Sequence, residues 1–128
     1  MKQGEFYFCE KCKNLVRVVD AHADALVCCG QPMDLLTPHT EDTGKEKHVP
    51  VIVAEGEKTR IILGDEPHPM TEAHYIDFIQ VETKDGKIGS QYVKGQEKAE
   101  AVFNLRADEI VEVLAYCNLH GLWSKKIN

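Results

Sequence analysis

The feature that most constrains how this chain can fold is a set of four cysteines within its first 29 residues. Cys9 and Cys12 have two residues between them, and after fifteen more residues Cys28 and Cys29 stand side by side. A spacing of two lets both thiolates face one ion, and soft thiolates favour zinc or iron in a tetrahedral site. Neighbouring side chains tend to diverge, so we expect the adjacent pair to distort that tetrahedron. The spacing predicts a metal site; four unrelated reduced cysteines are the alternative, and ligand type leaves zinc and iron both open.

The segment around these cysteines is short and has few runs that could form a core. Strand-like runs occur at 6–8 and 15–19, and a segment of this size needs a metal because it cannot fold on apolar burial alone. Residues 37–47 are polar and contain a proline and a glycine, which is typical of a linker or a long loop. We therefore predict two domains, a metal-dependent one over 1–36 and a larger one over 37–128.

A second group of potential ligands lies in the larger domain. It contains His48, His68, His74, Cys117 and His120. A histidine taken singly is more often a surface or hydrogen-bonded residue than a ligand. A mixed imidazole and thiolate set suits zinc, iron or copper. Five candidates exceed the four ligands of a closed structural zinc site and fit a redox metal with one open position, although a Cys-His zinc site with bystander histidines stays open.

The larger domain is rich in short runs with strand character. Asp85-Gly86 is a hairpin signal because both positions tolerate positive φ. Residues 108–116 fit a helix or a strand, and their β-branched content favours the strand. The expected strands are 49–53, 59–63, 74–83, 87–93, 101–105 and 108–116. Many short strands with turns between them predict an all-β fold, an antiparallel sandwich or barrel.

Composition excludes several functional classes. The chain has 128 residues, of which 43% are hydrophobic, and a net charge of -6. An acidic chain without a basic stripe is a poor binder of nucleic acid or of a membrane surface. There is no secretory signal and no run near the roughly 18 apolar residues of a membrane span, so we expect a cytoplasmic protein. Reduced thiols in that compartment favour metal ligation over disulfides.

Several motifs resemble a known family. YFCEKC and LVCCGQPM look like the desulforedoxin-type iron module, and EKHVPVI, PHPMTEAHYI and CNLHGLW look like the catalytic domain of superoxide reductases. Together they span residues 7–123. The chain thus resembles the desulfoferrodoxin, or two-iron superoxide reductase, family.

The resemblance implies a fold, two iron sites and an activity. One iron would be held by the four cysteines, and a seven-stranded, immunoglobulin-like β-sandwich would carry the catalytic iron. That second iron would have four equatorial imidazoles, from His48, His68, His74 and His120, with Cys117 as the axial thiolate. The implied enzyme is a homodimer that reduces superoxide to hydrogen peroxide with electrons from rubredoxin or a similar donor. Non-enzymatic zinc binding, simple electron carriage and superoxide dismutation are the rival functions.

Two charged residues beside His48 are further candidates for the site. Lys47 could hold a positive charge near the open position, and the resemblance implies that Glu46 can occupy that position on ferric iron. Sequence alone favours solvated loop charges for both. The chain also departs from the family pattern twice. Lys13 stands where glycine is common, which would strain the backbone if φ is positive there. Leu122 stands where histidine is frequent, at a position not matched to a ligand.

Overall fold

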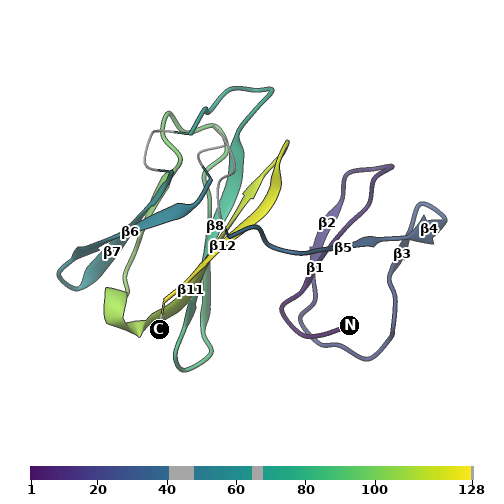
Figure 1. Cartoon of the computed structure of the whole chain (residues 1–128), viewed down its shortest axis with the longest axis horizontal. Helices are drawn as coiled ribbons and strands as arrows, with labels where there is room; N and C mark the ends of the chain where they lie inside the picture. Colours follow the sequence, from purple (N-terminus) through teal and green to yellow (C-terminus); the bar gives the residue numbers. More distant parts are fainter. Residues whose placement is uncertain (41–47, 65–67, 128) are drawn as a thin grey trace. The chain divides into compact units, whose positions relative to one another are not determined.

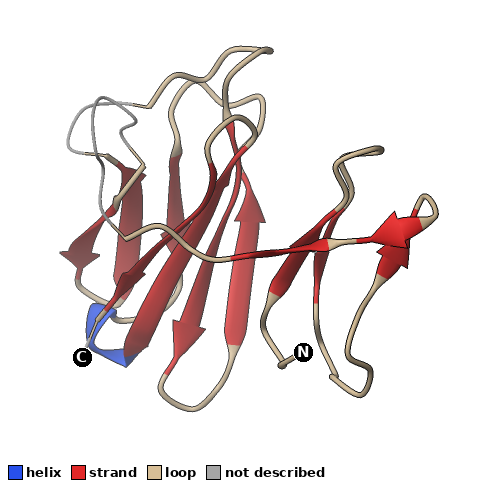
Figure 2. Ribbon diagram, turned by 45° about the vertical axis from the view of Figure 1, so that its right-hand side comes forward, coloured by secondary structure: helices blue, strands red, loops and turns tan. Residues whose placement is uncertain are grey.

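The computed structural model describes residues 1–40, 48–64 and 68–127. The chain divides into two compact units, Met1–Thr37 and Pro38–Asn128 (Figure 1). Strands dominate both units, and the helical structure of the described part is one turn of 3-10 helix, η1, at Ala107–Glu109 (Figure 2). The predicted all-β fold class is confirmed. No helix among the described residues is long and apolar enough to cross a membrane.

The smaller unit consists of two small antiparallel sheets. Strand β1 (Phe6–Phe8) lies in the centre of the first, between β2 (Leu15–Arg17) and β5 (Asp34–Leu36). The second is the pair β3 (Val27–Cys28) and β4 (Gln31–Pro32). The buried apolar side chains of the smaller unit are Phe6, Tyr7, Cys9 and Val18. Such a small core leaves much of the stability to whatever the cysteines bind.

In its described residues, the larger unit is a sandwich of two antiparallel sheets with seven strands. The first sheet has the order β10-β7-β6, and the second has the order β12-β11-β8-β9. The strands of the first sheet are β6 (Pro50–Glu55), β7 (Lys58–Leu63) and β10 (Glu100–Phe103). The strands of the second are β8 (Ile76–Thr83), β9 (Ile88–Tyr92), β11 (Ile110–Cys117) and β12 (Gly121–Lys126).

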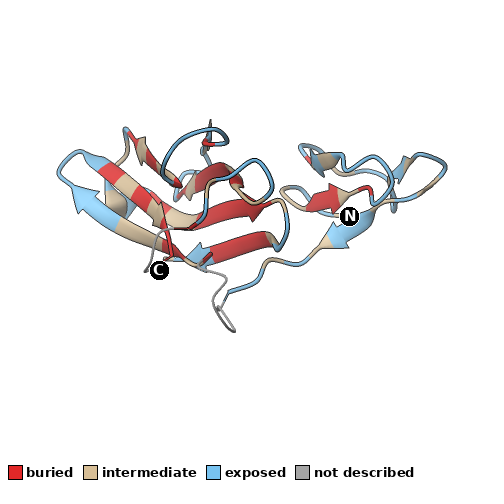
Figure 3. Ribbon diagram, turned by 90° about the horizontal axis from the view of Figure 1, so that it is seen from above, coloured by how far each residue is buried: buried red, intermediate tan, exposed pale blue. Residues whose placement is uncertain are grey.

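The core of the sandwich lies between the inner faces of its two sheets. Ile61 and Leu63 of β7 and Ile79, Val81 and Val113 of the facing sheet have no exposed surface. Their spacing of two along each strand is the period at which side chains return to the same face. Figure 3 shows the buried positions following the strands of this unit. The sandwich is therefore stabilised by apolar packing of its own.

Two local expectations about this unit are confirmed. The ambiguous segment 108–116 is strand from Ile110 onward, after the single turn of η1. Gly86 lies in the hairpin between β8 and β9 with a φ of 85°. A positive φ is a conformation that glycine adopts at no steric cost, which is why the dipeptide marks this turn.

Candidate metal centres

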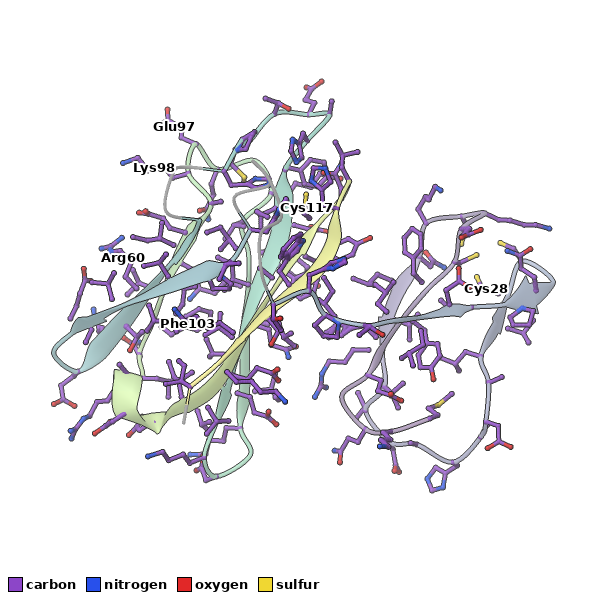
Figure 4. All side chains as sticks on the ribbon, in the orientation of Figure 1. Cys28, Arg60, Glu97, Lys98, Phe103 and Cys117 are labelled. Atoms are coloured by element: carbon purple, nitrogen blue, oxygen red, sulfur yellow. The ribbon has the colours of Figure 1, made fainter. Side chains whose placement is uncertain are left out.

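The four cysteines of the smaller unit converge on one point. Their sulfur atoms all lie within 4.8 Å of one another, and no disulfide joins them. The Sγ atoms of Cys12 and Cys28 are 3.5 Å apart, and those of Cys28 and Cys29 are 3.9 Å apart. Sulfur atoms of the unit gather near the labelled Cys28 in Figure 4. Four convergent thiols are a donor set that fits a soft tetrahedral ion such as zinc or iron.

The backbone explains how two adjacent cysteines reach the same site. Cys29 has a φ of 53°, in the left-handed region, and Gly30 follows with a φ of 76° in the turn between β3 and β4. This left-handed turn brings the side chains of Cys28 and Cys29 together where an extended backbone would point them to opposite faces. The expected divergence of the adjacent pair is thus overcome by local backbone geometry.

Lys13 follows the other cysteine pair and is strained as expected. Its φ is 68°, and its N–H donates a hydrogen bond to the carbonyl of Cys9 at 2.8 Å. This bond closes the Cys9–Cys12 loop, and it holds Lys13 in a conformation that non-glycine residues adopt at a cost.

Hydrogen bonding divides the four thiols into more and less acidic groups. Donation from the backbone N–H of Cys12 lowers the pKa of Cys9 to about 7. Hydrogen bonding with the sulfurs of Cys12 and Cys9 raises the pKa of Cys28 to about 12. Hydrogen bonding with Cys12 also raises the pKa of Cys29. The Cys28 and Cys29 thiols therefore retain their protons at neutral pH unless a cation replaces them.

The second candidate centre lies where several strand ends of the sandwich meet. His48 precedes β6, His74 precedes β8, Cys117 ends β11 and His120 lies in the turn to β12. One ligand atom from each of these four lies within 4.8 Å of every other. The imidazoles of His48 and His120 approach to 3.2 Å between Nε2 and Nδ1, although 72 residues separate them.

His68 joins this group through its ring. Its centroid lies 4.6 Å from that of His48 and 4.7 Å from that of His74. Its Nδ1 lies 2.7 Å from the Pro69 carbonyl, which can only accept, so Nδ1 carries the proton. In this tautomer a neutral ring would have its lone pair on Nε2, the form in which histidine binds a metal. The structure thus gathers all five residues that the sequence proposed for the second site.

The electrostatics of this group fit a bound cation. Nε2 of His74 is buried and has no hydrogen-bond partner among the described residues. Burial, and then the nearby His120, lower the pKa of His74, so its ring is neutral at physiological pH. Cys117 is fully buried; burial raises its pKa, and donation from the N–H groups of Leu119 and His120 opposes that rise. Imidazoles around one cysteine sulfur are a donor set that suits iron, zinc or copper once a cation displaces the thiol proton.

Trp123 is a neighbour of the site that the sequence did not single out. Its ring stacks on His48, with 4.4 Å between centroids and 13° between planes, and it also contacts His39 at 4.7 Å. The available signal was its place three residues after His120 as the sole tryptophan. Leu122 beside it is buried and outside the ligand group, so that departure from the family pattern leaves the five residues intact. Glu46 and Lys47 lie outside the described residues.

Family models match both units of the chain. A desulfoferrodoxin N-terminal domain model matches residues 1–36, and a desulfoferrodoxin model matches residues 40–126. This chain belongs to the desulfoferrodoxin family. The resemblance seen in its motifs is therefore confirmed.

Individual members of the desulfoferrodoxin family match nearly end to end. A desulfoferrodoxin homolog of Archaeoglobus fulgidus is 47% identical over 93% of this chain and 94% of its own length. The desulfoferrodoxin of Nitratidesulfovibrio vulgaris is 42% identical over 94% of both chains. The crystal structure of the superoxide reductase from Treponema pallidum is 30% identical, with a TM-score of 0.78 over 95% of this chain and 97% of that one.

Proposed function

We propose that this chain is a superoxide reductase that converts superoxide to hydrogen peroxide. One electron and two protons are consumed for each superoxide, and the electron comes from a rubredoxin-like donor protein. The observation that carries this proposal is the convergence of four imidazoles and one buried cysteine sulfur at one end of the sandwich. The likeness to a superoxide reductase structure over nearly the whole chain supports it.

Each of the five residues has a role in holding the catalytic iron. The imidazoles of His48, His68, His74 and His120 and the sulfur of Cys117 would be its protein ligands. The bound iron would supply the electron and an open coordination position for the substrate anion. The Pro69 carbonyl orients the His68 ring, and the amides of Leu119 and His120 direct partial positive charge at the sulfur.

Access to the site differs between its two sides. His48, His68 and Cys117 are buried, so the protein shields that side of the site from water. His120 is exposed, so a small anion can reach the ligand group from the solvent. We propose that Lys47 attracts superoxide to the site and that Glu46 would supply a carboxylate ligand to the iron in its ferric state. We further propose a second iron at the four cysteines and a homodimeric enzyme.

Metal content and product stoichiometry test the proposal. Protein from iron-replete cells should contain about two irons per chain and, when pre-reduced, should form one peroxide for each superoxide without releasing oxygen. Release of oxygen would mean dismutation, and two zinc ions without iron would mean a structural module. Sedimentation of the loaded protein measures the dimer.

Substitution of Cys117, the proposed sulfur ligand, tests whether the second centre is separate from the four-cysteine centre. Cys117→Ser should remove the thiolate-to-iron absorption of the second centre and leave that of the four-cysteine centre. Cys117 is the only cysteine outside the smaller unit, so the two chromophores separate by position. Loss of both absorptions together would contradict the assignment.

A further inference from the structure

Asn118 lies in the turn from β11 to β12, and its side chain reaches the loop that carries His74. Its Oδ1 accepts a hydrogen bond from the N–H of Tyr75 at 2.9 Å, and its Nδ2 donates to the carbonyl of Ala73 at 3.0 Å. Its backbone N–H also donates to the Tyr75 carbonyl at 3.2 Å. One residue thus holds both neighbours of a candidate ligand.

The strand pairing alone does not fix this junction. The β8–β11 ladder shifts register near its start, between Ile110 and Glu112, and again between Tyr116 and Cys117, and it ends with the pair of Cys117 and Ile76. An irregularity of this kind leaves a residue unpaired and bends the strand. Asn118 follows immediately, so its amide supplies the connection between the Cys117 turn and the His74 loop at the point where the ladder stops.

The His74 loop has an internal closure of its own. The N–H of His74 donates to Oγ1 of Thr71 at 3.0 Å, and the N–H of Thr71 donates to the His74 carbonyl at 2.9 Å. These bonds fix the backbone shape of the loop but not its distance from β11. The side chain of Asn118 links this loop by hydrogen bonds to the turn that carries Cys117 and His120, more than forty residues further along the chain.

We propose that Asn118 is a positioning residue that sets His74 against Cys117 in the second centre; this rests on the ligand set proposed above. A planar amide is suited to the task because it offers a donor and an acceptor at once. Aspartate keeps only the acceptor, and alanine keeps neither. Removing a hydrogen-bonding group behind a metal ligand typically lowers metal affinity about 10- to 100-fold.

Cobalt(II) bound to the full chain provides a measure that does not depend on superoxide. In Asn118→Ala, an excess of chelator should remove cobalt from the histidine-cysteine centre about tenfold faster than in the parent. The thiolate-to-cobalt absorption of Cys117 should shift as well. The rate of cobalt release from Asn118→Asp should lie between the rates of the parent and Asn118→Ala, because aspartate retains the hydrogen bond from the N–H of Tyr75. Release from the four-cysteine centre should stay at the parent rate in each variant.

Gln91→Ala is the matched control. It removes another amide whose Nε2 donates to a backbone carbonyl, that of Val102 at 2.6 Å, between β9 and β10. Its cobalt release and absorption should equal those of the parent even if its melting temperature falls. If Asn118→Ala does not fold, Asn118→Asp gives the comparison.

Three results would overturn the proposal. The first is parental cobalt release and absorption in a folded Asn118 variant, and the second is equal acceleration of cobalt release in Gln91→Ala. A parent that binds cobalt without a Cys117 thiolate band would overturn it too. Failure of the proposed enzyme function has a different signature. It would leave the cobalt results as expected while the iron-loaded parent failed to reduce superoxide.

Discussion

Backbone strain is concentrated at single residues of the four-cysteine centre. Lys13 and Cys29 are the non-glycine residues with positive φ in the described part of the chain. Cys29 is a candidate ligand, so its unusual φ serves to turn a sulfur inward. Lys13 is not a candidate ligand, and its side chain packs over the Phe8 ring at 5.7 Å, a weak exposed cation–π contact. A substitution at Lys13 can therefore relieve backbone strain without removing a candidate sulfur ligand.

Substitutions at Lys13 measure this strain. Lys13→Gly and Lys13→Ala both lose the contact with Phe8, but only glycine adopts a φ of 68° freely. Left-handed geometry costs alanine about 1–2 kcal/mol, and the greater freedom of glycine in the unfolded chain offsets about 0.7 kcal/mol. The glycine variant should be more stable by about 1 kcal/mol, measured by denaturant titration of the thiolate-to-metal absorption. Equal midpoints would show that the turn relaxes around alanine.

Glu46 and Lys47 are two further single residues for which we predict a role in the reaction. Lys47 adjoins His48, so its ammonium can lie within a Debye length of about 8 Å of the site at physiological salt. With a net charge of -6 on the chain, a local cation should assist the approach of superoxide. Lys47→Ala should slow association in pulse radiolysis and flatten its dependence on ionic strength.

Glu46→Ala is the counterpart of that variant. A carboxylate cannot attract an anion, so the association rate should stay near that of the parent. The resting ferric spectrum should change, because a hard carboxylate ligand suits ferric iron. A parental rate and salt slope in Lys47→Ala would identify Lys47 as a solvated loop charge.

At the scale of elements, the two cysteine-bearing turns of the smaller unit bring their sulfur atoms into one hydrogen-bonded cluster. Cys28 and Cys29 have raised pKa values because their sulfurs hydrogen-bond with that of Cys12. Thiols with raised pKa values hold their protons at pH 7, whereas a metal binds the thiolate. Metal binding must therefore displace protons.

The pH dependence of zinc binding tests this directly. Displacement of about two protons should raise the apparent affinity of the four-cysteine centre about 100-fold per pH unit near neutrality. The sign follows from the raised pKa values, since lower pH favours the protonated, metal-free form. Calorimetric titration in buffers of different ionisation enthalpy counts the protons. An affinity that stays constant with pH would mean that the sulfurs are already ionised before the metal arrives.

For the whole molecule, the two units differ in what stabilises them. The smaller has three buried apolar residues besides the buried Cys9, whereas the sandwich has an apolar core contributed by both sheets. A small core cannot offset the conformational entropy of its own chain, so metal ligation must contribute the difference.

Cys9→Ser should therefore unfold one unit and spare the other. Residues 1–37 should lose protection from hydrogen exchange, because a serine hydroxyl does not replace a thiolate ligand. The core amides of β8 and β11 should remain protected, and pre-reduced protein should still consume superoxide. Loss of the absorption of the second centre in this variant would show that the two units do not fold independently.

The sequence by itself determined the chemistry of the ligands and the class of the fold. The Cys9-x2-Cys12 spacing and the CNLHG turn each place two ligands within a few residues of one another. Over so short a range, the local backbone is enough to bring both ligands to one ion. Short strand-like runs separated by turn signals predicted strands, because β-branched residues fit a pleated, half-buried surface. The left-handed φ of Cys29, which reconciles the adjacent cysteines, was not readable, because that backbone choice depends on the turn around it.

Only the tertiary structure decided which distant residues meet. His48 and His120 are 72 residues apart, and their 3.2 Å approach depends on how β6 and the β11–β12 turn are held by the two packed sheets. Pairing register and the irregularity before Cys117 set that geometry, and neither is encoded in the spacing of the ligands. Asn118 and Trp123 emerged for the same reason: each acts through a contact with a residue far away in sequence, which no local pattern specifies.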